Sequence, residues 1–359
     1  MNDRVHPVDR ENLRSRIRQE LATFLAAQRR HMTDIDDGLL PLAEAVDAFV
    51  LGGGKRLRPA FAFWGYRGAG GKDDDNVITA VAALELVQAG ALIHDDLIDA
   101  SDTRRGEPSV HRRFGSLHAA GSWLGDPRQF GAAAAIILGD LCLVWSDEMF
   151  ASSGLDPVSV ARSRPVFDRM RKEVMLGQYM DVLSQVRGDR SVRRAGLVAR
   201  YKTAKYTVEH PLLFGAVLAE ADAVINDAYS AFGLPLGEAF QLRDAVLGVF
   251  GDPGLTGKPA GDDLREGKRT YLIARAFENA ASPADRDLLS RSLGDPALDE
   301  AAVMRVREVI VRSGALEATE ARIEALTASA MAALGTVELA EGAATVLREL
   351  AEVSVYRNT

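Results

Sequence analysis

Long segments of this chain repeat apolar side chains at helical spacing, and this pattern limits the possible folds more than any other feature. Between residues 10 and 30, apolar residues recur every four positions among Arg, Glu and Gln, at Leu13, Ile17, Leu21 and Leu25. This is the stripe of an amphipathic helix, which Asp9 would cap. The same reading predicts helices over 77–97, 128–150, 165–185, 193–220, 225–250, 268–280 and 316–334. Alternating runs bounded by turn residues are scarce, so we predict an all-α fold.

Glycine and proline interrupt the helical pattern in four predicted loops, LGGGKRLRP, GAGGKDDD, GDPGLTGKPAGDDLREGK and LGDPALDE. We find no linker rich in Pro, Ser or Gly, no low-complexity block and no repeat of fixed period. The chain of 359 residues is 47% hydrophobic and 26% charged, which is enough to bury a substantial core. We therefore expect a single domain over residues 1–359.

Charge and cysteine content narrow the functional classes. A net charge of −8 argues against general affinity for nucleic acid, because a surface that follows phosphates is basic. The single cysteine, Cys142, excludes an intramolecular disulfide and a thiol-rich metal site. The N-terminal MNDRVHPVDRENL lacks the layout of a signal peptide, and the apolar stretches fall short of the roughly 20 residues of a membrane span. We expect a cytoplasmic protein without a membrane span.

The stretch ALIHDDLIDASDTRRGEP, residues 91–108, crowds aspartates and arginines behind an apolar run. On a helix, Asp95 and Asp99 lie on one face about 6 Å apart along the axis, with Asp96 beside them, and like charges at this spacing destabilise a helix. Mg²⁺ would compensate, because it takes carboxylate oxygens and shares its shell with substrate phosphate. Arg104 and Arg105 add permanent cations suited to phosphate oxygens. The alternative is an acidic, solvated helix end; the apolar run favours a ligand with a greasy tail and an anionic head.

Three other segments are basic and rich in glycine or threonine. In GGGKRLRP, Gly52 to Gly54 allow close backbone approach and Lys55, Arg56 and Arg58 follow, without the spacing of a Walker loop. The remaining basic residues of interest are Lys202 and Lys205 in RYKTAKYT, and Lys258 and Lys268 in GKPAGDDLREGKRT. Taken singly, each segment is equally well explained as an ordinary basic surface.

Six sequence motifs occur here in the order typical of one enzyme family. Through them the chain resembles the trans-type isoprenyl diphosphate synthases, or polyprenyl synthetases. The motifs are GGGKRLRP, HDDLIDASDTRRGEPSVH, GQYMD, KTAKYT, FQLRD and GKPAGDDLREGKRT, covering about residues 45–275. The resemblance implies an all-α fold of roughly a dozen helices around a central cavity, usually in a homodimer. It also implies a prenyltransferase that uses three Mg²⁺ ions to condense an allylic diphosphate with isopentenyl diphosphate into an allylic diphosphate five carbons longer.

The resemblance also assigns roles to individual residues. Asp95 and Asp99 would be the main metal ligands, with Asp96 supporting and Asp244 binding the third ion. The isopentenyl diphosphate site would comprise Lys55, Arg58, Gln88 and Arg105. The allylic substrate and its diphosphate would be held by Arg104, Gln178, Lys202, Thr203, Phe240, Gln241, Lys258 and Lys268. Asp102 is expected to orient the arginine loop or to cap a turn.

One motif departs from the family pattern. The second aspartate-rich motif usually reads DDxxD, but here it reads RDAVLG, so Asp244 is kept while Ala245 and Gly248 replace two aspartates. The retained Asp244 favours activity, and the two losses predict weaker support for the metal. Asp252 is best explained as a turn aspartate before Pro253.

The family sets product length at the fifth and fourth residues before the first aspartate, which are Gly90 and Ala91 here. Small side chains leave the cavity open, with Val87 and Leu84 deeper on the same face, so the resemblance implies a product longer than fifteen carbons. We expect geranylgeranyl diphosphate made from farnesyl diphosphate, and a longer polyprenyl diphosphate is the alternative. A weakly active regulatory subunit of a hetero-oligomeric synthase and, less favoured, a terpene cyclase also remain open.

Overall fold

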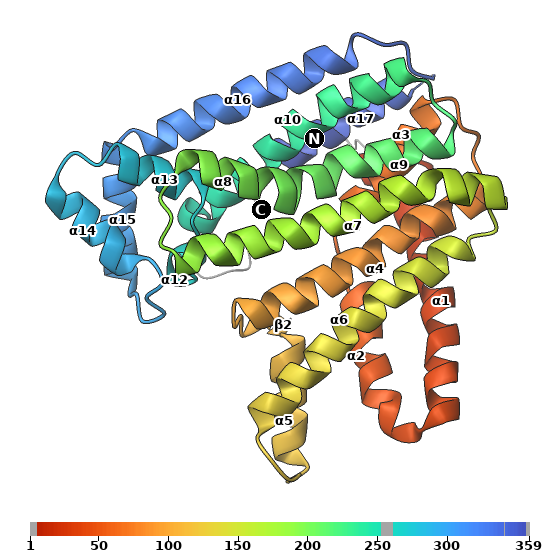
Figure 1. Cartoon of the computed structure of the whole chain (residues 1–359), viewed down its shortest axis with the longest axis horizontal. Helices are drawn as coiled ribbons and strands as arrows, with labels where there is room; N and C mark the ends of the chain where they lie inside the picture. The colour runs from red at the N-terminus through yellow and green to blue at the C-terminus, as the bar shows by residue number, and fades with distance from the viewer. Residues whose placement is uncertain (1–5, 253–260, 341, 357–359) are drawn as a thin grey trace. The chain divides into compact units, whose positions relative to one another are not determined.

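The computed structural model describes residues 6–252, 261–340 and 342–356 (Figure 1). Within these ranges the chain forms two compact units, one of residues up to 63 and 72–162, the other of residues 64–71 and those from 163 onward. The all-α prediction is confirmed. In the described ranges the strands are limited to two-residue β1 (Thr103–Arg104) and β2 (Glu107–Pro108), which pair antiparallel.

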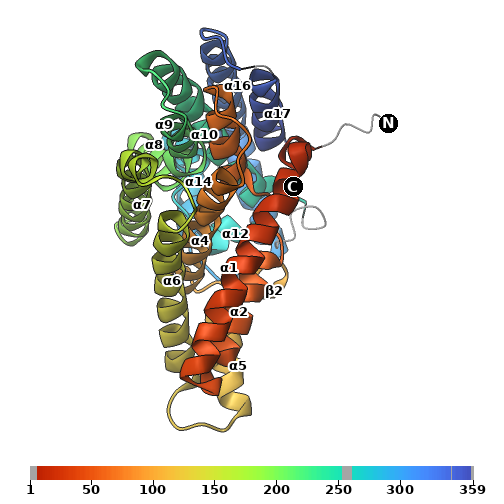
Figure 2. The same ribbon diagram turned by 90° about the vertical axis from the view of Figure 1, so that its right-hand side faces the viewer.

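The first unit is built from long helices. Its elements are η1 (Pro7–Asn12), α1 (Leu13–Ile35), η2 (Asp37–Leu39), α2 (Leu40–Leu51), α3 (Leu57–Gly68) as far as residue 63, α4 (Asp75–Ile98), β1, β2, α5 (Val110–Ala120), α6 (Pro127–Ala151) and the start of α7 (Pro157–Val186). Helix α4 contacts α1 and α6, and Figure 2 shows α1 and α2 side by side. Asp74 caps α4 by accepting a hydrogen bond from the Asn76 N–H.

The predicted stripe of α1 is confirmed, because Leu13, Ile17, Leu21 and Leu25 are all at most 2% exposed. The predicted cap is wrong. The helix begins after Asn12, which makes no side-chain cap, and the Asp9 carboxylate instead accepts a 2.5 Å bond from Arg14 Nε. A 3₁₀ turn, η1, precedes the helix and moves Asp9 away from the cap position.

The second unit surrounds α10. Its elements are the rest of α3 and α7, α8 (Val192–Val198), η3 (Ala199–Glu209), α9 (His210–Leu218), α10 (Ala223–Phe250), α12 (Asp262–Arg265), α13 (Tyr271–Glu278), α14 (Pro283–Ser292), α15 (Glu300–Arg312), α16 (Ala315–Leu334) and α17 (Ala343–Val355). Helix α10 packs along α16, as Figure 1 shows, and also contacts η3, α9 and α17. It is therefore the central helix of this unit.

Segment η3 is a π-helix inside the stretch that the sequence predicts as one ordinary helix. Glycines of the flanking helices allow its backbone to approach closely. A Cβ at Gly177 in α7 would lie 2.4 Å from the Lys202 nitrogen, and one at Gly237 in α10 would lie 2.5 Å from Ala204 backbone atoms. No other residue fits at these two positions without a shift of η3.

Helices α4 and α6 are long and apolar enough to cross a membrane by length and composition alone. In α4, however, 72% of the apolar window is buried inside the protein, as in the core helix of a compact domain. Their composition is thus weak support for a membrane span.

Candidate active site

The aspartate cluster lies at the C-terminal end of α4, as the sequence predicts. The helix ends at Ile98, and the Asp99 N–H still donates a 2.8 Å bond to the Asp95 carbonyl. Ala100 then takes a left-handed conformation, with φ of 53°, which turns the chain away. Asp95 and Asp99 are half-buried and one helical turn apart, so the two carboxylates share one face.

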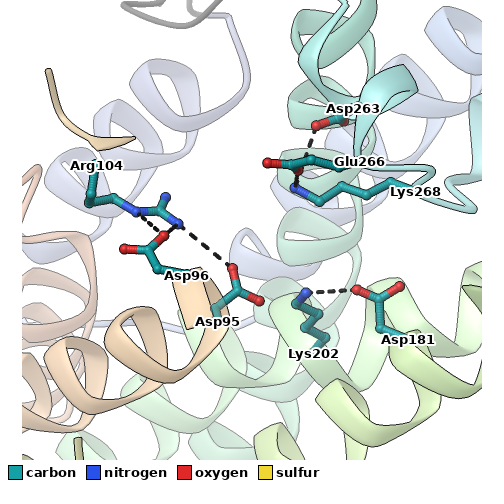
Figure 3. Close-up of polar contacts among 8 residues, drawn as sticks. All are labelled: Asp95, Asp96, Arg104, Asp181, Lys202, Asp263, Glu266 and Lys268. Carbon is teal, nitrogen blue, oxygen red and sulfur yellow. Dashed lines mark hydrogen bonds and ion pairs between the residues drawn. The ribbon is translucent and has the colours of Figure 1, made fainter. Parts of the chain in front are cut away.

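Asp96 differs from its neighbours because it points into the protein. Its residue is 1% exposed, and Arg104 donates two hydrogen bonds to its Oδ1, while Asp95 Oδ2 lies 3.8 Å from the same guanidinium (Figure 3). Burial raises the pKa of Asp96 above its ordinary value, although the bonds from Arg104 partly oppose this. Asp96 thus fixes the direction of Arg104, and its supporting role toward metal remains a prediction.

One narrow face of α4 leads away from the aspartates. Between residues 80 and 90 every position is buried except Gln88. Ala91 follows Gln88 by three residues and Asp95 follows Ala91 by four, so the three side chains lie on the same face of the helix. Gly90 lies on a different face. A Cβ there would be 2.8 Å from the carbonyl oxygen of Gly139 in α6, so Gly90 permits α4 and α6 to pack. Ala91 is therefore the product-length candidate on the accessible face.

Val87 and Leu84, predicted deeper on this face, are 1% and 0% exposed. Both belong to the packed core of the first unit. Their role in limiting the product stays a prediction, as does that of Gly90.

The basic loop between α2 and α3 presents the residues predicted to bind isopentenyl diphosphate. Lys55 is exposed and Arg58 is half-buried on the first turn of α3. Arg105, on the turn between β1 and β2, is held against this loop, since its Nη1 donates a 2.8 Å bond to the Gly53 carbonyl. The first unit thus brings Lys55 and Arg105 to one loop.

Asp102 does not contact the arginine pair. Its Oδ1 accepts a 2.7 Å bond from Arg112 Nε, and its carbonyl accepts a bond from the Ser109 N–H at 3.0 Å. These bonds join the end of the cluster to the start of α5. Its expected role of orienting the arginine loop or capping a turn stays a prediction.

The second unit positions its lysines with acidic partners. Lys202 Nζ lies 2.7 Å from Asp181 Oδ2, and Lys268 contacts Glu266 and, at 3.6 Å, Asp263 Oδ1 (Figure 3). Thr203 follows Lys202 on η3, and the π-helical register fixes where both project. The remaining predicted contacts of this unit are Gln178 on α7 and Phe240 and Gln241 on α10, while Lys258 lies outside the described residues.

The altered second motif has a structural explanation. Asp244 is half-buried on α10, and Ala245 is 2% exposed, so an aspartate at 245 would be buried in the core. At Gly248 a Cβ would lie 2.2 Å from Asp263 Oδ2. The Asp263 carboxylate therefore occupies the space where the usual fifth aspartate would begin.

Sequence reasoning missed the partners of the predicted cations. Asp181 and the pair Asp263 and Glu266 stand inside motifs that were recognised, but nothing in their spacing says which cation each one meets. Glu85 is the buried partner of Arg56. The only hint of this in the sequence is that Glu85 is a single charged residue within an apolar run.

The carboxylates fit a hard divalent cation. Among residues 6–252, 261–340 and 342–356, no three Asp, Glu, His or Cys side chains gather closely enough to hold a metal ion by themselves. Asp95 and Asp99 supply part of an oxygen shell, and Mg²⁺ ordinarily completes such a shell with water and substrate phosphate. The donor set suits Mg²⁺ bound together with a diphosphate.

The all-α scaffold carries carboxylates that suit a hard cation and basic side chains that suit phosphate oxygens. This combination is typical of an enzyme that acts on diphosphate esters. The sequence model described as polyprenyl synthetase matches residues 41–310. This chain belongs to the polyprenyl synthetase family. It is a trans-prenyl diphosphate synthase, a transferase of the prenyltransferase class.

Individual relatives agree on the class and differ in product. The chain is 33% identical over 274 residues to geranylfarnesyl diphosphate synthase from Aeropyrum pernix, covering 75% of this chain and 79% of that one. It is 31% identical to geranylgeranyl diphosphate synthase from Methanosarcina mazei, covering 69% and 73%. A crystal structure of geranylgeranyl pyrophosphate synthase from Corynebacterium glutamicum, complexed with isoprenyl diphosphate and magnesium, superposes with a TM-score of 0.92 at 42% identity, covering 95% and 97%.

Proposed function

We propose that this chain condenses farnesyl diphosphate with isopentenyl diphosphate to give geranylgeranyl diphosphate, with Mg²⁺ as cofactor. The allylic C–O bond breaks, a C–C bond forms to the terminal carbon of isopentenyl diphosphate, and one proton leaves, giving one diphosphate per condensation. The observation that carries the proposal is the half-buried pair Asp95 and Asp99 on one face of α4, with the Arg104 guanidinium, which Asp96 orients, 3.8 Å from Asp95 Oδ2.

Each set of residues has a distinct task in this proposal. When bound by Asp95, Asp99 and Asp244, Mg²⁺ supplies charge neutralisation for the departing diphosphate. Arg104, Lys202 and Lys268 hold the allylic diphosphate through charge-assisted hydrogen bonds, which strengthen as negative charge develops on the leaving group. Three ions per site, as the family resemblance implies, and a contribution from Lys258 are part of the same proposal.

The remaining assignments concern the second substrate and the prenyl tail. In this proposal isopentenyl diphosphate is bound by Lys55, Arg58, Gln88 and Arg105. Phe240 and Gln241 flank the condensing double bond, with Gln178 and Thr203 completing the allylic site. Ala91 supports a product longer than fifteen carbons. Its small side chain lies on the accessible face of α4 with Gln88 and Asp95 and leaves room for a longer prenyl tail.

We also propose that the protein acts as a cytoplasmic homodimer. Support for self-association comes from α6, whose exposed side chains include Ile136, Ile137 and Val144, at 49%, 54% and 60%. Several exposed apolar side chains on one helix favour a protein interface there. Sedimentation of the purified chain tests this, with a species of twice the monomer mass expected.

The second candidate is a weakly active regulatory subunit, which the loss of two aspartates at Ala245 and Gly248 favours. The decisive experiment incubates the purified chain alone with Mg²⁺, farnesyl diphosphate and labelled isopentenyl diphosphate, and then sizes the products. A labelled product of twenty carbons is expected. Absence of any elongated product would refute the synthase proposal, longer products would revise its length, and a cyclic hydrocarbon would indicate a cyclase.

A further inference from the structure

The loop that carries Lys55 is held by a set of arginines, which we call the arginine clamp and define as Arg14, Arg18, Arg56 and Arg105. Each of these residues donates to a backbone carbonyl at the end of α2 or in the loop. Arg14 Nη1 bonds Gly54 at 3.1 Å, Arg18 bonds Leu51, Arg56 Nη2 bonds Val50 at 2.5 Å, and Arg105 Nη1 bonds Gly53 at 2.8 Å. Four guanidiniums therefore fix the backbone of residues 50–54.

Arg56 is the member of the clamp that lies inside the protein. It is 5% exposed, whereas its neighbour Lys55 is exposed and Arg58 is half-buried. Its backbone is left-handed, with φ of 53°, and it stands two residues after Gly54, where Gly53 and Gly54 have φ values of 133° and 137°. A left-handed backbone is unfavourable for arginine, so surrounding contacts must hold it.

Glu85 of α4 supplies the contact that holds Arg56. This glutamate is 6% exposed and forms an ion pair with the Arg56 guanidinium, which also reaches the Val50 carbonyl. A buried ion pair of this kind is expensive to break on one side only, because the remaining charge stays buried. The pair therefore ties the end of α2 and the loop to α4, the helix that carries Asp95.

Gly54 shows how the pair connects to the predicted diphosphate ligands. The position of its missing Cβ is 3.5 Å from Arg105 Nη2 and 3.8 Å from the Arg56 carbon Cζ. Arg105 also stands over the Phe49 ring, 5.7 Å from its centre. The two guanidiniums thus both lie beside Gly54, so we expect a movement of Arg56 to disturb the loop that carries Lys55 and holds Arg105.

We propose that Glu85 and Arg56 are positioning residues for isopentenyl diphosphate: they set the loop conformation that presents Lys55, Arg58 and Arg105 to its diphosphate. The inference rests on the proposed function of this loop. Neither residue contacts substrate in this scheme, and the effect passes entirely through the loop backbone.

The variant Glu85→Gln distinguishes a positioning role of Glu85 from a purely electrostatic effect of its negative charge. If Glu85 acted only as a nearby negative charge, its neutralisation would strengthen the binding of an anionic diphosphate. Positioning predicts the opposite, because the amide holds Arg56 less well and the loop shifts. Titration calorimetry on the full chain, with isopentenyl diphosphate and without Mg²⁺ or allylic substrate, should show a Kd raised about tenfold. The KM for isopentenyl diphosphate should rise with it, and the KM for the allylic diphosphate should not.

Glu148→Gln is the matched control, because Glu148 belongs to the same unit and pairs with neutral Gln28 at 2.8 Å rather than with the loop. Its Kd should equal that of the wild type. An unchanged or lowered Kd in Glu85→Gln would overturn the proposal. If that variant does not fold, Arg56→Lys keeps the charge but cannot bridge Glu85 and Val50, and an unchanged Kd there would overturn it equally. A wild type that binds isopentenyl diphosphate but elongates nothing would instead contradict the proposed function alone.

Discussion

Gly177→Ala places a single methyl group against the π-helical segment η3. The new Cβ would lie 2.4 Å from the Lys202 nitrogen and 2.6 Å from the Tyr201 carbonyl carbon, where ordinary contact begins at 3.4 Å. Both atoms belong to the backbone, so no side-chain rotation relieves the overlap. Segment η3 must move away from α7, and Lys202 must move with it.

The magnitude follows from two opposing terms. Replacing glycine by alanine inside a helix favours folding by about 1 kcal/mol. Overpacking against a rigid neighbour costs about 1–3 kcal/mol, and contact with backbone belongs at the upper end. We expect Gly177→Ala to lower the free energy of unfolding by about 1–2 kcal/mol and to raise the KM for the allylic diphosphate, because the 2.7 Å contact of Lys202 with Asp181 is disturbed.

Gly196→Ala is the control, since the same substitution in α8 meets no atom within 4 Å. It should stabilise the protein by up to about 1 kcal/mol and leave KM unchanged. Urea unfolding followed by circular dichroism, together with steady-state kinetics, measures both quantities. Equal stability and equal KM in the two variants would refute the claim that a glycine at 177 is required for the π-helical register.

Two further predictions concern the candidate active site, and a third concerns a buried histidine. Asp95→Ala should abolish most turnover with unchanged circular dichroism, and near-normal activity would contradict its role as a metal ligand. Ala91→Phe should shorten the product in a chromatographic assay, whereas Gly90→Ala should mainly disturb α4 against α6, because its Cβ would lie 2.8 Å from a backbone oxygen; an unchanged product in Ala91→Phe would place the limit elsewhere. Burial lowers the pKa of His210 below 6.5 despite its bond to Glu173, so stability should fall as pH drops below 6.5, by at most about 1.4 kcal/mol per pH unit from this group. Urea midpoints at pH 7 and pH 5.5 check this, and the same slope in His210→Gln would refute it.

Helical periodicity was sufficient for the main helices, because each buries a continuous stripe that local spacing reveals. The α1 stripe and the approximate extent of α4 follow directly from apolar spacing, whereas the two residues by which α4 begins earlier than predicted depend on the cap by Asp74. The cap of α1 did not follow, since Asp9 has an arginine partner five residues later that competes for its carboxylate. The π-helical register of η3 depends on glycines in two other helices, which local sequence does not reveal.

In the candidate site too, local sequence predicts some features, whereas others depend on tertiary packing. The motifs of the family resemblance were sufficient to predict roles for Asp95, Arg104 and Lys202, because each stands in a short local pattern. The different orientations of Asp96 and Asp95 arise from tertiary packing, as does the separation of Gly90 from Ala91. The Asp263 carboxylate over Gly248 is a contact between segments distant in sequence, and no spacing rule predicts it.

As a trans-prenyl diphosphate synthase, this chain forms a carbon–carbon bond at the expense of an allylic diphosphate. A single reaction of the purified chain with Mg²⁺ and both substrates tests this. It measures the release of diphosphate and the incorporation of labelled isopentenyl diphosphate into extractable product. One diphosphate released for each isopentenyl unit incorporated, and none when either substrate is omitted, is the predicted result. Diphosphate release from the allylic substrate alone, or incorporation of no label, would contradict the claim.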